Sequence, residues 1–405
     1  MTGRRRRQML FAALYFSEGA PIGFLWWALP TRLRTAGVEV DAITGLLAIL
    51  VLPWALKFLG APFIDILRGP RWPLRAWIAA CQVVMGVLIL ATLAFDWQKD
   101  FALVGALLLA HAVAAASQDV AVDAYAVSVV PATELGVINA WMQGGVLTGR
   151  SVFGGGALLI DAWLGPRVTL VLLVVAIWSS LAVLVALGEP EPAPTSGLAS
   201  RRTEFAAALR AVLGRGSTWL VIAFAAVSGA GFEAVGIVVG PFLIDRGFSS
   251  EQVGAFLFVP AVAAMIAGSF ASGWLSDRVG HLRAVAASLT GMAVTILGIA
   301  WAGTIWAAGL PTLALLVVLY VLIGAFTTTS YALFMAHTDR RLGATQLSAS
   351  MSATNLCESW SAFAVGRLTG AFGYGPAFTV MAVASLAGLP LLWWMRPGRA
   401  GESGR

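Results

Sequence analysis

The sequence predicts an all-α membrane protein with twelve transmembrane helices arranged as two six-helix halves. Three observations predict this fold: the composition, a succession of twelve long apolar segments, and an internal repeat. Hydrophobic residues make up 59% of the 405 residues and charged residues only 11%. Soluble domains carry about 25% charged residues, so this chain has too little polar material to cover a water-facing surface.

The apolar segments are long enough to cross a bilayer as helices, which takes about 20 residues each. Divided at Pro, Gly and charge clusters, they span residues 8–33, 42–65, 74–95, 101–130, 134–160, 167–188, 217–244, 251–275, 284–307, 311–337, 345–370 and 374–395. A transmembrane β-barrel would need short strands of alternating polarity, which the sequence lacks. The first apolar run is too long and too polar for a cleavable signal peptide, so we expect it to be retained as the first span.

Basic residues gather on one side of the predicted spans. Of the 26 Lys and Arg residues, 18 fall on the side of the N-terminus and 6 on the other. Because cytoplasmic loops carry the excess of Lys and Arg, both termini are predicted to be cytoplasmic.

A constant offset of 212 residues relates the two halves of the chain. It pairs residues of two separate loops and of one span, namely Asp65 with Asp277, Arg71 with Arg283, and Gly154 with Gly366. Between the halves lies a segment rich in Pro, Glu and Ser and then in Arg, a composition typical of a connector. We therefore predict a first six-helix half at 1–188, a cytoplasmic linker at 189–216 and a second half at 217–405.

The loop after the eighth span reads Gly273-Trp-Leu-Ser-Asp-Arg-Val-Gly-His-Leu-Arg283, and the equivalent first-half loop keeps an Asp followed by Arg residues. This pattern resembles the signature of the major facilitator superfamily. The resemblance implies a transporter that works by alternating access, with charged loop residues forming a cytoplasmic gate. The gate residues are Asp65, Arg71, Asp277, Arg278 and Arg283; for Asp65 and Asp277, local helix capping is the alternative role.

A narrower resemblance covers residues 10 to 165. The segments 52–65, 116–125 and 154–158 are similar to the branch that transports peptides, acetyl-coenzyme A and drugs, including AmpG-like muropeptide permeases and siderophore permeases. The resemblance implies a peptide, amino-sugar or siderophore-like solute and the cytoplasmic (inner) membrane of a bacterium. The superfamily's antiporter signature needs a Gly-Pro pair on the fifth span, and its absence here favours symport.

Seven formal charges lie inside the predicted spans, and each costs about 2.5 to 3.5 kcal/mol at a helix centre unless it is paired or hydrated. They are Glu18, Lys57, Asp119, Asp123, Arg150, Glu233 and Glu358. Five acids thus face two bases, which leaves three carboxylates that must take up a proton or bind a cation. For Lys57, extension of the side chain to the cytoplasmic interface is an equally weighted alternative.

Asp119 and Asp123 are four residues apart, so they share a helix face. Two carboxylates this close in a low dielectric cannot both ionise easily and are expected to titrate as a unit. With Glu18, they are the predicted proton-coupling residues. The alternative is a structural role, with each Asp bonded to neighbouring backbone.

Polar residues on the fifth and eleventh spans predict a substrate cavity. Arg150 is either a clamp for a substrate anion or the counter-ion of a nearby carboxylate, and the sequence leaves both open. On the eleventh span, interhelical hydrogen bonding is an equal alternative. The predicted cavity residues are Gln118, Tyr125, Asn139, Gln143, Arg150, Glu233, Asn355 and Glu358.

The histidines lack metal-ligand spacing, and no phosphate-binding loop is present, so we expect no metal, no cofactor and no ATP hydrolysis. The expected function is secondary active transport rather than enzymatic catalysis. Its partners are a small-molecule substrate, protons and the lipid bilayer, without nucleic acid, and the protein is expected to be a monomer. A membrane sensor or intramembrane enzyme on the same fold is the alternative.

Overall fold

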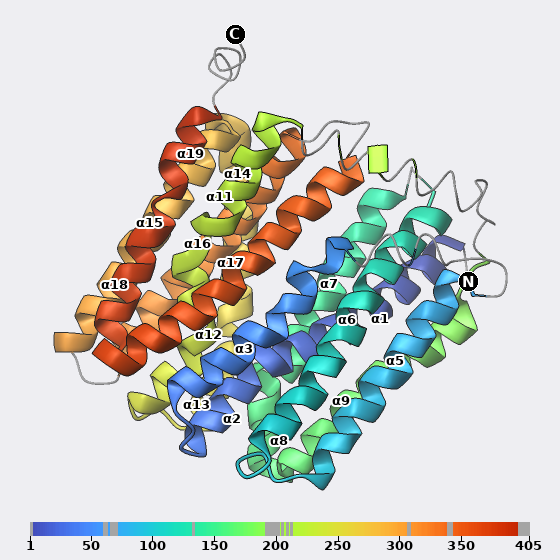
Figure 1. Cartoon of the computed structure of the whole chain (residues 1–405), viewed down its shortest axis with the longest axis horizontal. Coiled ribbons are helices and arrows are strands. Elements are labelled where there is room, and N and C mark those ends of the chain that lie inside the picture. Colours follow the sequence, from blue (N-terminus) through green and yellow to red (C-terminus); the bar gives the residue numbers. More distant parts are fainter. Residues whose placement is uncertain are drawn as a thin grey trace. The chain divides into compact units, whose positions relative to one another are not determined.

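The computed structural model describes residues 3–59, 64, 72–131, 134–190, 203, 206–207, 210, 214–305, 309–337 and 343–395. Within them, the chain is built from helices, and each of the twelve predicted spans coincides with one helix or with a run of abutting helices (Figure 1). Ten of these are long and apolar enough to cross a membrane. The prediction of an all-α membrane fold is therefore confirmed.

The chain divides into two compact units. The first contains residues 1–32, 56–204 and 250–258, and the second contains residues 33–55, 205–249 and 259–405. Most of the predicted linker lies outside the described residues.

Among the described residues, the first unit contains seven α-helices, one short π-helix (η1) and one short 3-10 helix (η2). They are α1 (Gly3–Gly23), η1 (Phe24–Ala28), α5 (Leu74–Ala91), η2 (Thr92–Ala94), α6 (Phe101–Val129), α7 (Leu135–Phe153), α8 (Gly155–Leu164), α9 (Pro166–Leu187) and α13 (Ser250–Phe258). The first of its three chain segments ends at Arg32, within α2 (Leu29–Thr35). The helix is interrupted at Gly154, whose backbone is not helical and which separates α7 from α8.

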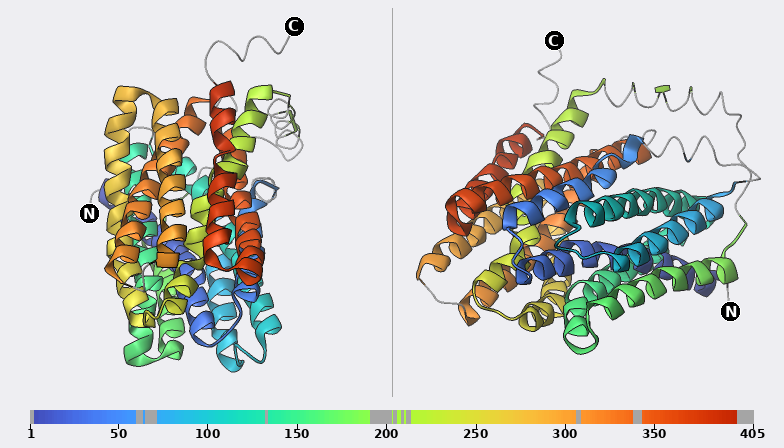
Figure 2. Two further views of the ribbon diagram at one scale, coloured as in Figure 1. Left: turned by 90° about the vertical axis from the view of Figure 1, so that its left-hand side faces the viewer. Right: turned by 60° about the horizontal axis from the view of Figure 1, so that its bottom comes forward.

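The second unit contains the other helices of the described residues. They are α3 (Val40–Ala55), α11 (Gly216–Ser228), α12 (Ala230–Asp245), α14 (Pro260–Val279), α15 (His281–Ile305), α16 (Leu310–Ala336), α17 (Gly343–Phe372), α18 (Tyr374–Ser385) and α19 (Gly388–Trp394). Figure 2 shows α14, α15 and α16, coloured yellow to orange, side by side.

The two units differ from the two predicted halves in the placement of two helices: α3 belongs to the second unit and α13 to the first. Helix α3 packs on α17, where a Cβ added to Gly366 would lie 1.7 Å from the Thr44 hydroxyl oxygen. Helix α13 packs on α8, where a Cβ on Gly155 would lie 2.1 Å from the Phe258 nitrogen. Small residues permit such close approach of helices in membranes. The division at 1–188 and 217–405 stays a prediction about duplication in the sequence.

Two predicted spans, 134–160 and 345–370, fall on α7–α8 and α17, which are not among the ten apolar helices. Both spans carry polar residues that were predicted to line a cavity, and these residues make the two spans more polar than the other ten. Their polarity is expected of helices that face a hydrated interior rather than lipid.

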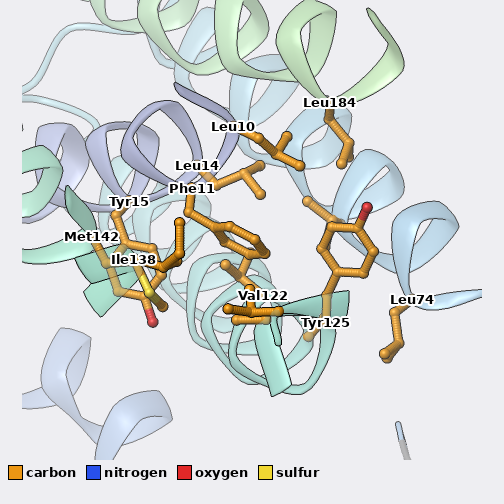
Figure 3. Close-up of a cluster of buried hydrophobic side chains, with 14 of the residues drawn as sticks. Leu10, Phe11, Leu14, Tyr15, Leu74, Val122, Tyr125, Ile138, Met142 and Leu184 are labelled. Carbon is orange, nitrogen blue, oxygen red and sulfur yellow. The ribbon is translucent and has the colours of Figure 1, made fainter. Parts of the chain in front are cut away.

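The core of the first unit is a cluster of buried apolar side chains from α1, α5, α6, α7 and α9 (Figure 3). Phe11 of α1 and Tyr125 of α6 lie in its middle, with ring centroids 5.7 Å apart. Because α1 is held against α6 and α7 by this cluster, the polar residues that follow on α1 are brought to the same place.

Glycines set the spacing of α1 and α7. A Cβ on Gly149 would lie 2.5 Å from the Phe16 carbonyl oxygen, and one on Gly19 would lie 2.2 Å from the Val146 carbonyl oxygen. The two backbones are therefore in direct contact. Gly144, by contrast, faces open space.

Candidate functional site: an intramembrane acid–base cluster

The first unit holds an ion pair inside its membrane-spanning part. The Lys57 ammonium lies 2.8 Å from Oδ2 of Asp119, with side-chain exposures of 14% and 7%. Lys57 follows the end of α3, whereas Asp119 lies on α6. The pair shows that Lys57 is directed to a carboxylate within the protein.

Asp123, one turn further along α6, has a different partner. Its Oδ1 accepts a hydrogen bond from the Tyr15 hydroxyl on α1. The residue is exposed, whereas Asp119 is buried. The two aspartates share a helix face as predicted, yet each is engaged separately, one by a cation and the other by a phenol.

Glu18 completes the cluster from α1. Only 9% of the residue is exposed, and its Oε2 is buried without a hydrogen-bond partner among the described residues. The charges that act on it are those of Asp119, Asp123, Lys57 and Arg150. The structure thus brings the three predicted proton-coupling residues into one electrostatic cluster.

Next to this cluster lies a buried hydrogen-bond network that joins four helices. The Gln82 amide nitrogen on α5 donates to Ser17 of α1 at 3.1 Å and to Ser180 of α9 at 2.6 Å. Gln118 of α6 also donates to Ser17, at 3.2 Å. Gln118, a predicted cavity residue, is fully buried here and holds helices together.

The predicted polar stripe on α7 has Asn139 and Gln143 exposed and Arg150 partly buried. Among the described residues, no carboxylate lies within ion-pair distance of Arg150, although its charge acts on Glu18 at longer range. Of the two roles left open for Arg150, this geometry favours an anion clamp over a fixed counter-ion.

Tyr125 lies away from the acid–base cluster. It is fully buried, and its hydroxyl accepts a hydrogen bond from the Glu189 amide at 2.7 Å and donates one to the Glu189 carbonyl at 2.8 Å. Arg7 binds the Glu189 carboxylate at 3.1 Å and that of Glu134 at 2.9 Å. Tyr125 and Arg7 therefore fix the start of the linker, a role that sequence reasoning missed.

The predicted cavity residues of the second unit lie on α12 and α17. Asn355 donates to the Trp54 carbonyl at 3.3 Å, and the neighbouring Ser359 donates to the Ala48 carbonyl at 2.7 Å. This pattern fits the alternative of interhelical hydrogen bonding. Glu233 and Glu358 are partly buried and each has a polar or electrostatic partner.

The predicted gate is only partly described. Asp65 and Arg71 lie outside the described residues, as does the side chain of Asp277, which is in the last turn of α14. Arg278 and Arg283 are exposed, at the end of α14 and the start of α15. The gate stays a prediction.

Ion pairs elsewhere were not predicted, because their members lie far apart in the sequence. In the first unit, Asp161 binds Arg32 and accepts a hydrogen bond from Thr169. In the second, Asp245 binds Arg34 at 2.6 Å and accepts from the Tyr374 hydroxyl at 2.8 Å. No group of three His, Cys, Asp or Glu side chains suited to a metal occurs within the part of the chain that the structure describes.

One family model matches most of the chain. A model described as Major Facilitator Superfamily matches residues 10–366. The chain belongs to the Major Facilitator Superfamily. Membership confirms the predicted family and its helical transporter fold.

Relatives within the superfamily support the narrower resemblance. The chain is 27% identical over 283 residues to the anhydromuropeptide permease of Escherichia coli K12; the match covers 69% of this chain and 57% of that protein. It is 22% identical to the putative transporter AmpG 4 of Rickettsia felis, covering 93% and 94% of the two chains. It is also 26% identical to an uncharacterized protein of Haemophilus influenzae, covering 97% and 95%. The named relatives are permeases and transporters, which bears out the expectation of a transporter rather than an enzyme.

Solved structures show the same fold at low identity. A D-xylose-proton symporter superposes with a TM-score of 0.78 at 13% identity, covering 97% of this chain and 98% of the symporter. The nucleoside transporter NupG gives 0.73 at 11% identity, covering 96% and 99%.

Proposed function

We propose that the protein is a proton-coupled symporter of the bacterial cytoplasmic membrane that moves a muropeptide-like or siderophore-like solute by alternating access. The observation that carries the proposal is the cluster of Glu18, Asp119, Asp123 and Lys57 within the membrane-spanning part of the first unit. Three acids and one lysine in one place are costly in lipid, and such residues are found in membrane spans mainly where they have a function. A carboxylate cluster with one acid in excess of its cations and hydrogen-bond donors is suited to binding and releasing a proton.

The substrate class is supported by two independent features. The E. coli relative is named for anhydromuropeptides, although this chain spans 57% of that protein's length. Arg150, with Asn139 and Gln143 on the same helix, offers a guanidinium and two amides to a ligand. A guanidinium binds carboxylates by paired hydrogen bonds, so we propose a polar solute that carries a carboxylate.

Purified protein in proteoliposomes tests the proposal. With the external side acid, we expect accumulation of labelled anhydromuropeptide or ferric siderophore, and its loss when a protonophore collapses the gradient, because proton entry supplies the driving force. Arg150→Lys keeps the charge but not the paired hydrogen bonds, so it should raise KM. Accumulation that persists after the gradient is collapsed would contradict proton coupling.

The orientation is tested by reporter fusions. Fusions after Gly188 and after Gly398 should both behave as cytoplasmic, since 18 basic residues lie on that side of the spans against 6 on the other. A fusion within the loop at Asp96 to Asp100 should report the opposite side and serves as the control. A periplasmic signal at either of the first two positions would overturn the orientation.

A further inference from the structure

The three acids of the cluster are not equivalent in this conformation. We propose that Glu18 carries the exchangeable proton, while Asp119 and Asp123 are ionised. The inference rests on the proposed proton coupling and assigns it to one residue of the cluster.

Asp119 is held ionised by its neighbour. Its Oδ2 lies 2.8 Å from the Lys57 ammonium, and both side chains are buried. Two opposite charges in contact in a low dielectric attract each other strongly, and protonation of the aspartate would leave the buried lysine unpaired. The pair is therefore stable only while Asp119 is charged.

Asp123 is stabilised as an anion in a different way. Its Oδ1 accepts a hydrogen bond from the Tyr15 hydroxyl. A phenol donates well to a carboxylate, and hydrogen bonds to a charged group are stronger than those between neutral groups.

Glu18 lacks each of these supports. The residue is 9% exposed, and its buried Oε2 has no hydrogen-bond partner among the described residues. The facing groups are Tyr15 on its own helix, Lys57 after α3, Asp119 and Asp123 on α6, and Arg150 on α7. Lys57 is neutralised by Asp119, and Arg150 is beyond ion-pair distance.

An ionised Glu18 would thus be a buried anion beside two further carboxylates. Burial without a partner strongly disfavours the charged form of such a group, and like charges disfavour it further. A proton on Glu18 removes both costs. It leaves two carboxylates, each with its own partner.

The arrangement also links the proton to the substrate. The charge of Arg150 acts on the Glu18 carboxyl, and among the described residues no carboxylate lies within ion-pair distance of Arg150. A substrate carboxylate bound to Arg150 would add negative charge beside Glu18 and favour its protonated form. By linkage, a protonated Glu18 favours binding of the anion, so solute and proton bind together, as symport requires.

Transport assays on Glu18→Gln test the assignment. Glutamine resembles the protonated acid in shape and charge, so gradient-driven accumulation should be lost while counterflow of substrate is retained. Glu39→Gln makes the same chemical change at an exposed position and should accumulate substrate as the wild type does. Retention of gradient-driven accumulation by Glu18→Gln would overturn the inference.

Infrared spectroscopy of the purified protein gives a readout that does not depend on transport. At neutral pH the wild type should show the carbonyl band of a protonated carboxyl group, which Glu18→Gln should lose. The double variant Lys57→Met/Asp119→Asn should keep the band, because it removes Asp119 without leaving the Lys57 charge free to stabilise an ionised Glu18. Loss of the band in the double variant, or its persistence in Glu18→Gln, would refute the assignment. If the wild type shows no proton-driven uptake, the proposed function fails, and the infrared band alone decides where the proton resides.

Discussion

Lys57→Met is expected to destabilise the protein strongly. Asp119 would be left as a buried carboxylate without its cation, and removal of one partner from a buried pair costs about 3–5 kcal/mol. Lys57 is 14% and Asp119 7% exposed, so water cannot readily replace the lost ammonium. The measurement is the thermal unfolding midpoint of the purified protein in detergent, which should fall well below that of the wild type.

The double variant Lys57→Met/Asp119→Asn is the matched control. It removes both charges, and neutral replacement of a whole buried pair is often close to neutral in stability. We expect its unfolding midpoint to recover most of the loss. If the single variant is as stable as the wild type, Lys57 does not neutralise Asp119, and the inference about Glu18 loses one of its supports.

The sequence predicted the helices because apolar length is a local property. Every span could be located from composition alone, including α17, whose polar residues make it the least apolar of them. The grouping of α3 with α17 was not predictable, because it depends on a contact between Gly366 and Thr44, more than 300 residues apart. Helix pairing is set by side-chain shape, which a hydropathy pattern does not record.

The charged residues of the candidate cluster were recognised in the sequence by residue type, but their pairing was not predicted. Lys57 and Asp119 were both recognised as intramembrane charges, yet their pairing across 62 residues needed the fold. Tyr15 was missed, although a signal existed: it lies three residues before Glu18 and so shares its helix face. Asp161 was missed because the predicted fifth span ended one residue before it.

Gly149→Ala is expected to disrupt the contact between α1 and α7. The new Cβ would lie 2.5 Å from the Phe16 carbonyl oxygen and 2.6 Å from the Ala20 nitrogen, both of which are backbone atoms. Backbone cannot move aside as a flexible side chain can, so the helices must separate. Overpacking of this kind costs about 1–3 kcal/mol. Because α1 carries Glu18 and α7 carries Arg150, their separation should impair accumulation of substrate as well as stability.

Gly144→Ala on the same helix separates this steric effect from a general effect of alanine. Gly144 is exposed, and a Cβ there would meet no atom within 4 Å. Since alanine favours helix over glycine by about 1 kcal/mol, this variant should be as stable as the wild type or slightly more stable. The two variants are compared by thermal unfolding and by the yield of monodisperse protein after detergent extraction. Equal behaviour of both would show that the close contact of α1 with α7 does not stabilise the fold, whereas a selective loss in Gly149→Ala would place that contact among the interactions that hold Glu18 and Arg150 in register.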